Sequence, residues 1–291
     1  MKTSSHSSRR DFLKLAGLAA TAAALPHPAV AANGSNQTAS SSATPALRFG
    51  VASYSFRKLS VDAVIESMHA LRTPWLNLKS FHLPYELTGE ALAAARQRYE
   101  AAGLQIVGGG TITLQKDTDE DMRPYFVYAK AAGMPLIVAA PSPATLPRVE
   151  RFAREFDLKI AIHNHGPEDK FFPSAVDVLK HIDGMDPRMG LCLDIGHATR
   201  AGADIVAEAK AAGARLFDVH MKDLKVPTEK DSQCIVGEGV LPIAPFLRQL
   251  QRMHYPGCVN LEYEIDEANP LPGMLRSIAY LRGIAAGFAA S

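Results

Sequence analysis

The chain has 291 residues, 47% of them hydrophobic and 21% charged, which is typical of a soluble globular protein with one large domain or two ordinary ones. Its formal net charge is only +1, so it lacks the basic field that a nucleic-acid-binding protein needs. The three cysteines, Cys192, Cys234 and Cys258, have neither zinc-ribbon spacing nor a disulfide framework, and Cys192 and Cys258 are predicted to be small core residues because they lie in apolar runs.

Residues 1–31 resemble a twin-arginine export signal. Ser8-Arg9-Arg10-Asp11-Phe12-Leu13-Lys14 precedes the apolar run Leu15–Leu25, and Ala29-Val30-Ala31 is a small-x-small cleavage pattern. The alternative is a membrane anchor, but the apolar run is short and rich in alanine for a bilayer span. Because the twin-arginine route carries folded proteins, we expect a periplasmic or secreted protein that is exported folded and keeps no stable membrane anchor after cleavage.

Residues 32–46 are predicted to be a disordered linker, because they are rich in serine, threonine, alanine and asparagine and show no apolar period. From Arg48 onward, strand-like segments alternate with segments of helical periodicity. The predicted strands are Arg48–Ser55, Trp75–Phe81, Leu104–Thr113, Pro135–Ala140, Leu158–His163, Met189–Asp194, Arg215–His220 and Gly257–Glu262. The predicted helices begin after Ser60 and Ser174 or span Glu90–Ala102, Thr118–Ala132, Pro147–Phe156, Ala203–Ala212, Ile243–Met253 and Gly273–Phe288.

This alternation predicts an α/β protein with a parallel sheet. Eight strand–helix units in about 240 residues match a single (β/α)8 TIM barrel. The alternative, a doubly wound open sheet, lacks support because no Gly-x-Gly-x-x-Gly follows the first strand. We therefore predict that residues 47–291 form one TIM-barrel catalytic domain.

The fifth to eighth predicted strands each end in a residue type that binds metals. These residues are His163, Asp194, His220 and Glu262. The carboxyl ends of barrel strands meet at one mouth, so four inward side chains there would suit one Mn²⁺, Zn²⁺, Co²⁺ or Fe²⁺ ion better than Mg²⁺ or Ca²⁺. For each residue alone, the alternative is structural: a satisfied histidine, or a carboxylate such as Asp194 that caps the next helix.

Several motifs resemble, in order and spacing, the xylose-isomerase-like TIM-barrel superfamily of sugar isomerases and epimerases. They are His163-Asn164-His165-Gly166, Asp194-Ile195-Gly196-His197, His220-Met221-Lys222-Asp223, Gly237-Glu238-Gly239 and Leu261-Glu262, and the resemblance covers Arg48 to Phe288. The group includes ketose 3-epimerases, hydroxypyruvate isomerase and inosose dehydratase.

The resemblance implies that Asp194, His220 and Glu262 are metal ligands. The family usually has glutamate at the end of strand five, where this chain has His163, with His165 as the alternative ligand. The resemblance also implies that His197 contacts the substrate.

The chemistry common to this superfamily is proton abstraction next to a carbonyl group, with a metal ion that holds the developing enediolate. Glu262 is the expected base, and the second acid or base is expected among His163, His165, Lys79 and Lys222. The alternative for Lys222 is an ion pair with Asp223 or Asp218, and the alternative for Lys79 is an ordinary surface lysine.

His165, His197, Glu238 and His82 are the expected substrate-binding residues, although Glu238 could instead brace its loop. Gly108-Gly109-Gly110 is expected either to leave open space for a sugar at the barrel mouth or to form a tight turn.

The favoured function is a metal-dependent isomerase or epimerase of a small sugar or cyclitol. Export argues against a phosphorylated substrate, and the sequence leaves the formation of a homo-oligomer open. Because the strand-five glutamate is absent, a lyase that performs β-elimination on a keto-sugar, 3-keto-glycoside or inosose is the first alternative. A non-catalytic sugar-binding barrel is the second.

Overall fold

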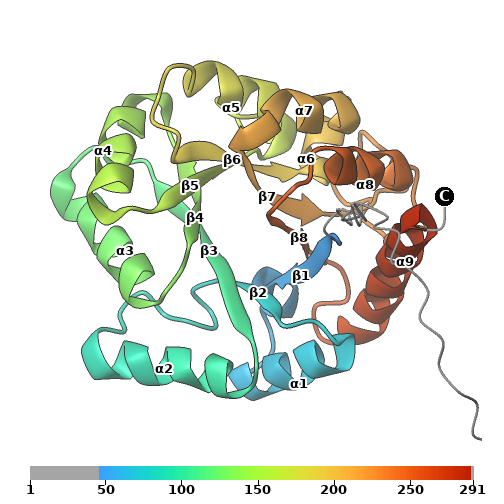
Figure 1. Cartoon of the computed structure of the whole chain (residues 1–291), viewed down its shortest axis with the longest axis horizontal. Helices are drawn as coiled ribbons and strands as arrows, with labels where there is room; N and C mark the ends of the chain where they lie inside the picture. The colour runs from blue at the N-terminus through green and yellow to red at the C-terminus, as the bar shows by residue number, and fades with distance from the viewer. Residues whose placement is uncertain (1–45, 290–291) are drawn as a thin grey trace, which may run out of the picture. The chain divides into compact units, whose positions relative to one another are not determined.

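Eight parallel strands, hydrogen-bonded in the order in which they occur along the chain, close into a barrel (Figure 1). The computed structural model describes residues 46–289, so the predicted signal peptide and nearly all of the predicted linker lie outside the described residues. The strands are β1 (Arg48–Ala52), β2 (Trp75–Leu78), β3 (Gln105–Leu114), β4 (Leu136–Pro141), β5 (Lys159–His163), β6 (Met189–Asp194), β7 (Leu216–Met221) and β8 (Cys258–Leu261). The prediction of a single (β/α)8 barrel is confirmed.

Helices surround the barrel and cover the outward faces of its strands (Figure 1). They are α1 (Val61–Leu71), α2 (Gly89–Ala101), α3 (Asp119–Ala131), α4 (Leu146–Phe156), α5 (Ala175–His181), α6 (Ile195–Arg200), α7 (Ile205–Ala212), α8 (Ile243–Arg252) and α9 (Leu271–Ala289). Side-chain oxygens begin several of them: Ser60 accepts from the backbone N–H of Ala63, and Thr118 accepts from that of Asp121. The predicted caps and apolar faces therefore place most helices correctly.

Three predicted strands, the first, second and eighth, extend past the carboxyl ends of the observed ones. After β1 the chain turns into a short 3₁₀ helix (Ser53–Phe56), and Glu262 follows β8 instead of closing it. Ser55 explains the bend, because its hydroxyl donates to the carbonyl of Leu261 at 3.2 Å and accepts from the N–H of Tyr263 at 2.9 Å. The mouth of the barrel is thus built from irregular backbone that side chains fix in place.

The inside of the barrel contains a small apolar cluster of its own, formed by Leu136, Val138, Ala161, Cys192 and Phe217. The expectation that the three β3 glycines leave open space at the mouth is wrong. Gly108 lies within the strand, and a Cβ atom there would come within 2.7 Å of the Leu136 side chain. These glycines allow close packing of β3 against its neighbours.

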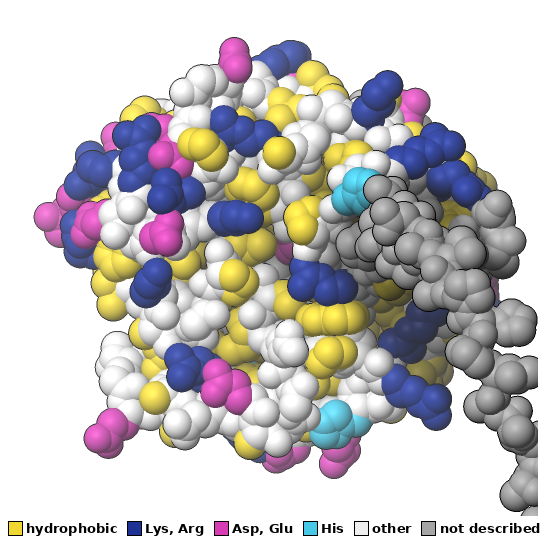
Figure 2. Space-filling model, in the orientation of Figure 1, with side chains coloured by type: hydrophobic (Ala, Val, Ile, Leu, Met, Phe, Trp, Pro, Cys, Tyr) yellow, Lys and Arg dark blue, Asp and Glu magenta, His cyan; other side chains and the backbone are white. Residues whose placement is uncertain are grey.

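The outer surfaces of the helices carry basic and acidic side chains side by side, as the left side of Figure 2 shows. On α3 and α4, Arg123 pairs with Glu155 and Arg151 pairs with Asp119. Such exposed pairs contribute little stability each. None of the helices that the structure describes has both the length and the apolar character needed to cross a membrane.

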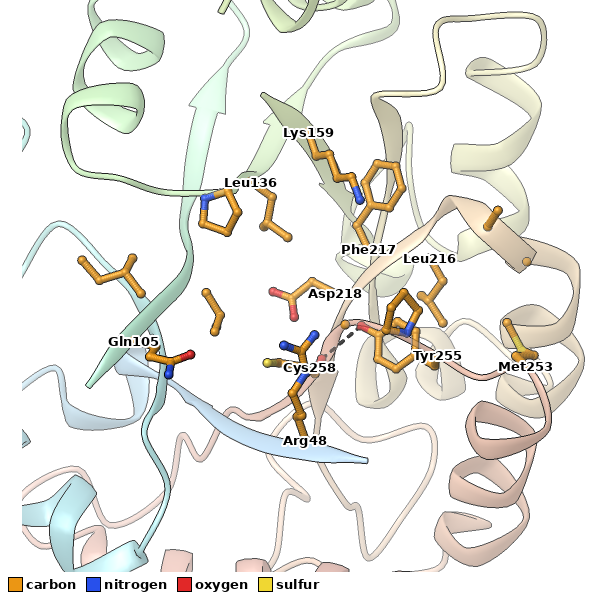
Figure 3. A pocket seen from close by; sticks show the side chains of 17 residues that line it. Arg48, Gln105, Leu136, Lys159, Leu216, Phe217, Asp218, Met253, Tyr255 and Cys258 are labelled. Atoms are coloured by element: carbon orange, nitrogen blue, oxygen red, sulfur yellow. Dashed lines mark hydrogen bonds between the residues drawn. The ribbon is translucent and has the colours of Figure 1, made fainter. Parts of the chain in front are cut away.

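A cavity of about 720 Å³ opens at the amino-terminal end of the barrel (Figure 3). Residues that begin strands line it, among them Arg48, Gln105, Lys159 and Leu216. Asp218 is the one carboxylate among the lining residues, and it is only 2% exposed. The carboxyl ends of the strands, where the predicted site lies, are at the opposite end of the barrel.

Candidate metal centre

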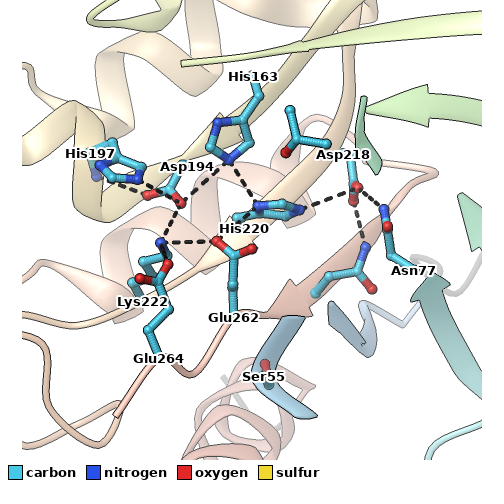
Figure 4. Close-up of polar contacts among 12 residues, drawn as sticks. Ser55, Asn77, His163, Asp194, His197, Asp218, His220, Lys222, Glu262 and Glu264 are labelled. Carbon is cyan, nitrogen blue, oxygen red and sulfur yellow. Dashed lines mark hydrogen bonds and ion pairs between the residues drawn. The ribbon is translucent and has the colours of Figure 1, made fainter. Parts of the chain in front are cut away.

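Four buried side chains from consecutive strands meet at the carboxyl end of the barrel (Figure 4). His163, Asp194, His220 and Glu262 each offer one ligand atom, and these atoms lie within 4.8 Å of one another. His163 Nε2 is 3.0 Å from His220 Nδ1 and 3.6 Å from Asp194 Oδ2. His220 Nδ1 is 3.2 Å from Glu262 Oε2. Barrel closure thus brings together the four residues on which the sequence hypothesis rests.

Asp194 has two separate tasks, one for each carboxylate oxygen. Its Oδ1 accepts the N–H of His197 at 2.8 Å and begins α6, so the predicted capping role and the predicted place in the cluster coexist. Its Oδ2 is buried and faces the cluster, where Lys222 Nζ lies 3.0 Å away. Asn164 fixes the backbone of Asp194 from β5, because its amide group both donates to Asp194 O and accepts from Asp194 N.

His220 turns its two ring nitrogens in opposite directions (Figure 4). Nδ1 faces His163 and Glu262, whereas Nε2 points into the barrel and is buried without a hydrogen bond. The nearest carboxylate oxygen on that side, Oδ2 of Asp218, is 4.0 Å from Nε2.

Asp218 lies one layer below the cluster and is held from three directions. Asn77 of β2 donates to its Oδ2 at 2.9 Å, and Asn260 of β8 donates to its Oδ1 at 2.7 Å. The N–H of Val219 also donates to Oδ1, at 2.9 Å. Burial raises the pKa of Asp218 to about 6, although His220 and these donors partly offset the effect of burial.

Lys222 places a positive charge among the carboxylates. Its Nζ lies 3.0 Å from Asp194 Oδ2 and 2.9 Å from Glu262 Oε2, and it also contacts Glu264 Oε1. Burial alone would lower the pKa of Lys222, but these three carboxylates raise it well above its usual value. The side chain is therefore a buried ammonium group that can donate but not accept a proton.

The alternative ion pair of Lys222 with Asp218 or Asp223 does not form. Asp218 is held by the two asparagines, and Asp223 accepts the backbone N–H groups of Gly237 and Gly239 at 2.9 and 3.1 Å. Asp223 therefore organises the loop that follows β7.

The two carboxylates of the cluster are ionised. Burial by itself raises the pKa of Asp194, but Lys222 and His197 outweigh burial and hold the pKa below its usual value. For Glu262, His220 and Lys222 likewise outweigh burial and hold the pKa well below its usual range. Both side chains thus carry the charge that a metal ligand or a general base requires.

The surroundings shift the pKa values of the two cluster histidines in opposite directions. Burial, followed by repulsion from His165, keeps the pKa of His163 well below its usual value, so this ring is neutral. Burial also lowers the pKa of His220, but Glu262 and Asp218 raise it more, and the net effect is upward. The low pKa of His163 favours the neutral form that binds a metal ion, whereas the carboxylates around His220 favour its protonated form.

Three further predicted residues lie around the cluster. The His165 ring centre is 4.3 Å from that of His163, and the His197 ring is 5.9 Å from His163, so both border the site. Lys79 is half-buried, and its Nζ is 3.4 Å from Thr111 O. Burial lowers the pKa of Lys79, partly offset by Glu262 and Glu264, so it is no ordinary surface lysine.

The structure does not bring His82 and Glu238 to the cluster. His82 is 3% exposed, and its Nε2 lies 3.2 Å from the carbonyl oxygen of Leu59. Glu238 is exposed and pairs with Arg276 of α9, which fits the predicted alternative of a loop brace.

Comparison with known proteins identifies the family. Residues 74–284 match the family described as xylose isomerase-like TIM barrel. The chain belongs to this family. Residues 6–26 match the twin-arginine translocation signal sequence, which indicates export across the cytoplasmic membrane. None of the curated proteins matches the chain in sequence.

Several solved structures have a barrel similar to that of this chain. An uncharacterised protein from Parabacteroides distasonis is 25% identical, with a TM-score of 0.64 over 81% of this chain and 98% of that one. The IOLI protein with a bound zinc atom is 13% identical, with a TM-score of 0.71 over 83% and 99% of the two chains. D-psicose 3-epimerase from Clostridium cellulolyticum, in complex with D-tagatose, is 13% identical, with a TM-score of 0.67 over 82% and 99%.

The cluster has the dimensions of a metal site. Tetrahedral ligands at about 2.1 Å from an ion lie about 3.4 Å from one another. The separations from His163 Nε2 to Asp194 Oδ2 and from His220 Nδ1 to Glu262 Oε2 are 3.6 and 3.2 Å. Oδ2 of Asp194, which pairs with Lys222 Nζ at 3.0 Å, completes a donor set of two imidazole nitrogens and two carboxylate oxygens. These residues fit a divalent ion.

Proposed function

We propose that this protein is a metal-dependent isomerase or epimerase that acts on a small non-phosphorylated sugar or cyclitol outside the cytoplasm, in the periplasm or after secretion. The observation that carries the proposal is the meeting of four buried potential ligands with the ammonium group of Lys222 at the carboxyl end of the barrel. Active sites of TIM-barrel enzymes lie at this end.

His163, Asp194, His220 and Glu262 are the proposed ligands. Two nitrogen and two oxygen donors suit Mn²⁺ or Zn²⁺, with Co²⁺ and Fe²⁺ as further candidates. A bound ion would polarise the substrate carbonyl and stabilise the negative charge that develops when the neighbouring C–H bond is broken.

Glu262 is the proposed general base, because its carboxylate is ionised, buried and directed at the centre of the cluster. Lys222 is the proposed acid, because it is protonated and lies 2.9 Å from Glu262 Oε2. It also contacts Glu264, which lies outside the proposed ligand set. Lys79, whose pKa is lowered by burial, is the proposed second proton-transfer group.

His165 and His197 are the proposed substrate-binding residues at the rim. Both rings are partly exposed, whereas His163 beneath them is only 3% exposed. Their nitrogens can donate to or accept from sugar hydroxyls. Because His197 also supplies the N–H that Asp194 accepts, its position is tied to that of a proposed ligand.

A lyase is the second candidate, and the observation that favours it is His163. An epimerase that works with two carboxylate bases would need a carboxylate on β5, and the neutral imidazole of His163 takes that place. Glu262 as the one base and Lys222 as the acid suffice to remove a proton beside a keto group and to protonate a leaving group.

Incubation of the metal-loaded protein with keto-sugars, 3-keto-glycosides and inososes in D₂O tests both candidates. Deuterium exchange or isomerisation without loss of a leaving group supports the isomerase. Release of water or an aglycone supports the lyase. Tight sugar binding with no exchange and no product would overturn both and leave a sugar-binding barrel.

The Glu262→Gln and Glu264→Gln variants form a matched pair for this assay. Removing a positioned general base typically lowers the rate about 10²–10⁴-fold, which is the loss expected for Glu262→Gln. Glu264→Gln removes a neighbouring carboxylate outside the proposed ligand set and is expected to retain more activity. Both variants are first checked for full metal content by elemental analysis, because Glu262 is also a proposed ligand. Equal losses in two metal-loaded variants would show that Glu262 is not the base.

A further inference from the structure

Nε2 of His220 needs a hydrogen-bond acceptor, and none of the proposed metal ligands provides one. A neutral imidazole that offers the lone pair of Nδ1 to an ion carries its proton on Nε2. In this structure Nε2 points into the barrel and is buried without a hydrogen-bond partner. A buried donor with no acceptor costs free energy, so the barrel interior should supply one.

Asp218 offers the nearest carboxylate, and a shift of about 1 Å in either side chain would bring it within hydrogen-bond distance. It lies two residues before His220 on the same inward face of β7, and its Oδ2 is 4.0 Å from His220 Nε2. Figure 4 shows the carboxylate between the imidazole and the amide of Asn77. Asn77 accounts for one hydrogen bond to Oδ2, and a carboxylate oxygen can accept a second.

The surroundings of Asp218 argue against a purely structural role. A buried carboxylate is costly without a positive partner, and asparagine donors alone would hold a neutral amide as well. Among the described residues, no lysine or arginine lies within ion-pair distance of Asp218, although Arg48 and Lys159 line the cavity that reaches it (Figure 3). In the part of the chain that the structure describes, the basic side chain within 4.0 Å of the Asp218 carboxylate is His220.

We propose that Asp218 is a positioning residue that accepts the Nε2–H of His220, fixes Nδ1 as the nitrogen that faces the ion and makes it a better ligand. The proposal rests on the metal site of the proposed function. The proposal also explains the two asparagines: Asn77 and Asn260 donate to the Asp218 carboxylate and orient it toward the imidazole of His220. Partners of this kind typically change metal affinity about 10–100-fold.

The direct test is calorimetric titration of the purified protein with Zn²⁺ at fixed pH, comparing wild type, Asp218→Asn and Glu208→Gln. Glu208 is the matched control: it is also a buried carboxylate, and it accepts the backbone N–H groups of Ala175 and Val176 away from the site. We expect Asp218→Asn to bind Zn²⁺ about 10–100-fold more weakly, while Glu208→Gln keeps wild-type affinity. Unchanged affinity in Asp218→Asn, or an equal loss in Glu208→Gln, overturns the proposal.

A second readout needs no variant and decides the matter if Asp218→Asn fails to fold. Nitrogen-15 NMR of the histidine rings in Zn²⁺-loaded wild-type protein reports which His220 nitrogen carries the proton. We expect a protonated Nε2 that exchanges slowly with solvent, and a proton on Nδ1 overturns the proposal. A wild-type protein that binds no Zn²⁺ overturns the proposed function and this role together, whereas normal binding with the opposite tautomer overturns only the role of Asp218.

Discussion

At the scale of single residues, the structure distinguishes the two histidines at the end of β5 as possible metal ligands. His163 is buried with its Nε2 directed at the cluster, whereas His165 is partly exposed at the rim. We therefore expect His163→Ala to lose bound metal and His165→Ala to keep it, as measured by elemental analysis of the dialysed proteins. Retention of metal by His163→Ala with loss by His165→Ala would reverse the assignment.

The remaining proposed ligands provide the comparison set for that measurement. Asp194→Ala, His220→Ala and Glu262→Ala are each expected to lose the ion, because each removes one of four donors. If two of these three variants kept a full complement of metal, the proposed centre would be wrong.

Sequence order predicted the cluster but not its support. The four residues could be found because each lies within one residue of the carboxyl end of a buried strand, and barrel strands end at one mouth. They are His163, Asp194, His220 and Glu262. The asparagines that hold Asp218 are 141 and 42 positions away from it along the chain, so no local pattern connects them. Contacts between residues so far apart in the sequence depend on how the strands are aligned in the closed barrel. The periodicity of a single strand does not predict that alignment.

At the scale of elements, the loop between β7 and α8 is organised by one carboxylate. Asp223 Oδ1 accepts the N–H groups of Leu224 and Leu241, and Oδ2 accepts those of Gly237 and Gly239. Lys222 is the first residue after β7 and directly precedes Asp223, so the geometry of this loop also sets the direction of that ammonium group. The Gly237-Glu238-Gly239 motif therefore has a structural explanation, in line with the predicted alternative of a loop brace.

Asp223→Asn is expected to destabilise this loop and the protein. An amide keeps one oxygen but turns an N–H group toward two other donors, and hydrogen bonds to charged groups contribute about 1.5–3 kcal/mol each. We expect a loss of about 2–4 kcal/mol in the free energy of unfolding by urea, with faster proteolysis between residues 222 and 242. Asp204→Asn, which alters a carboxylate that caps α7, is the control and should cost about 1 kcal/mol or less. Equal costs would contradict the role of Asp223.

The elements themselves were largely predictable, and the errors have a common cause. For helices with a clear apolar stripe, such as α1 and α8, the predicted bounds lie within a few residues of the observed ones. The short helix α6 was not expected, because it is only six residues long and begins at Asp194, a residue also claimed by the cluster. The predicted carboxyl ends of β1 and β2 lie several residues beyond the observed ones. The chain bends there because the Ser55 hydroxyl donates to Leu261 O and the Ser53 hydroxyl accepts the N–H of Lys79.

At the scale of the whole molecule, buried histidines couple global stability to pH. His82 is 3% exposed; its Nε2 lies 3.2 Å from the Leu59 carbonyl, and its Nδ1 is buried without a partner. A second proton would therefore create an unpartnered N–H in the interior, and burial lowers the pKa of His82 accordingly. His163 behaves in the same way.

The sign of the effect follows from proton counting. A histidine whose folded pKa is below its unfolded value of about 6.5 binds more protons when unfolded, so its stabilising contribution is complete above pH 6.5 and is lost as pH falls toward the folded pKa. Asp218, whose pKa is raised to about 6, acts oppositely between its unfolded pKa and pH 6. His82, His163 and His165, whose pKa values are lowered, each contribute a decline in the free energy of unfolding of the metal-free protein as pH falls below 6.5. Glu208 and His220, whose pKa values are raised, act in the same direction as Asp218 and against this decline.

Replacing His82 by asparagine isolates one of these contributions. Because each such group adds at most about 1.4 kcal/mol per pH unit to the slope, His82→Asn should flatten the decline in unfolding free energy below pH 6.5 by up to that amount. Urea unfolding curves of the metal-free protein at closely spaced pH values between 5 and 8 measure it. His254→Asn, which removes an exposed histidine, is the control. If wild type and His82→Asn show the same slope, His82 accepts a proton as readily in the folded barrel as in the unfolded chain. The buried Nδ1 would then need a hydrogen-bond partner, which this packing does not provide.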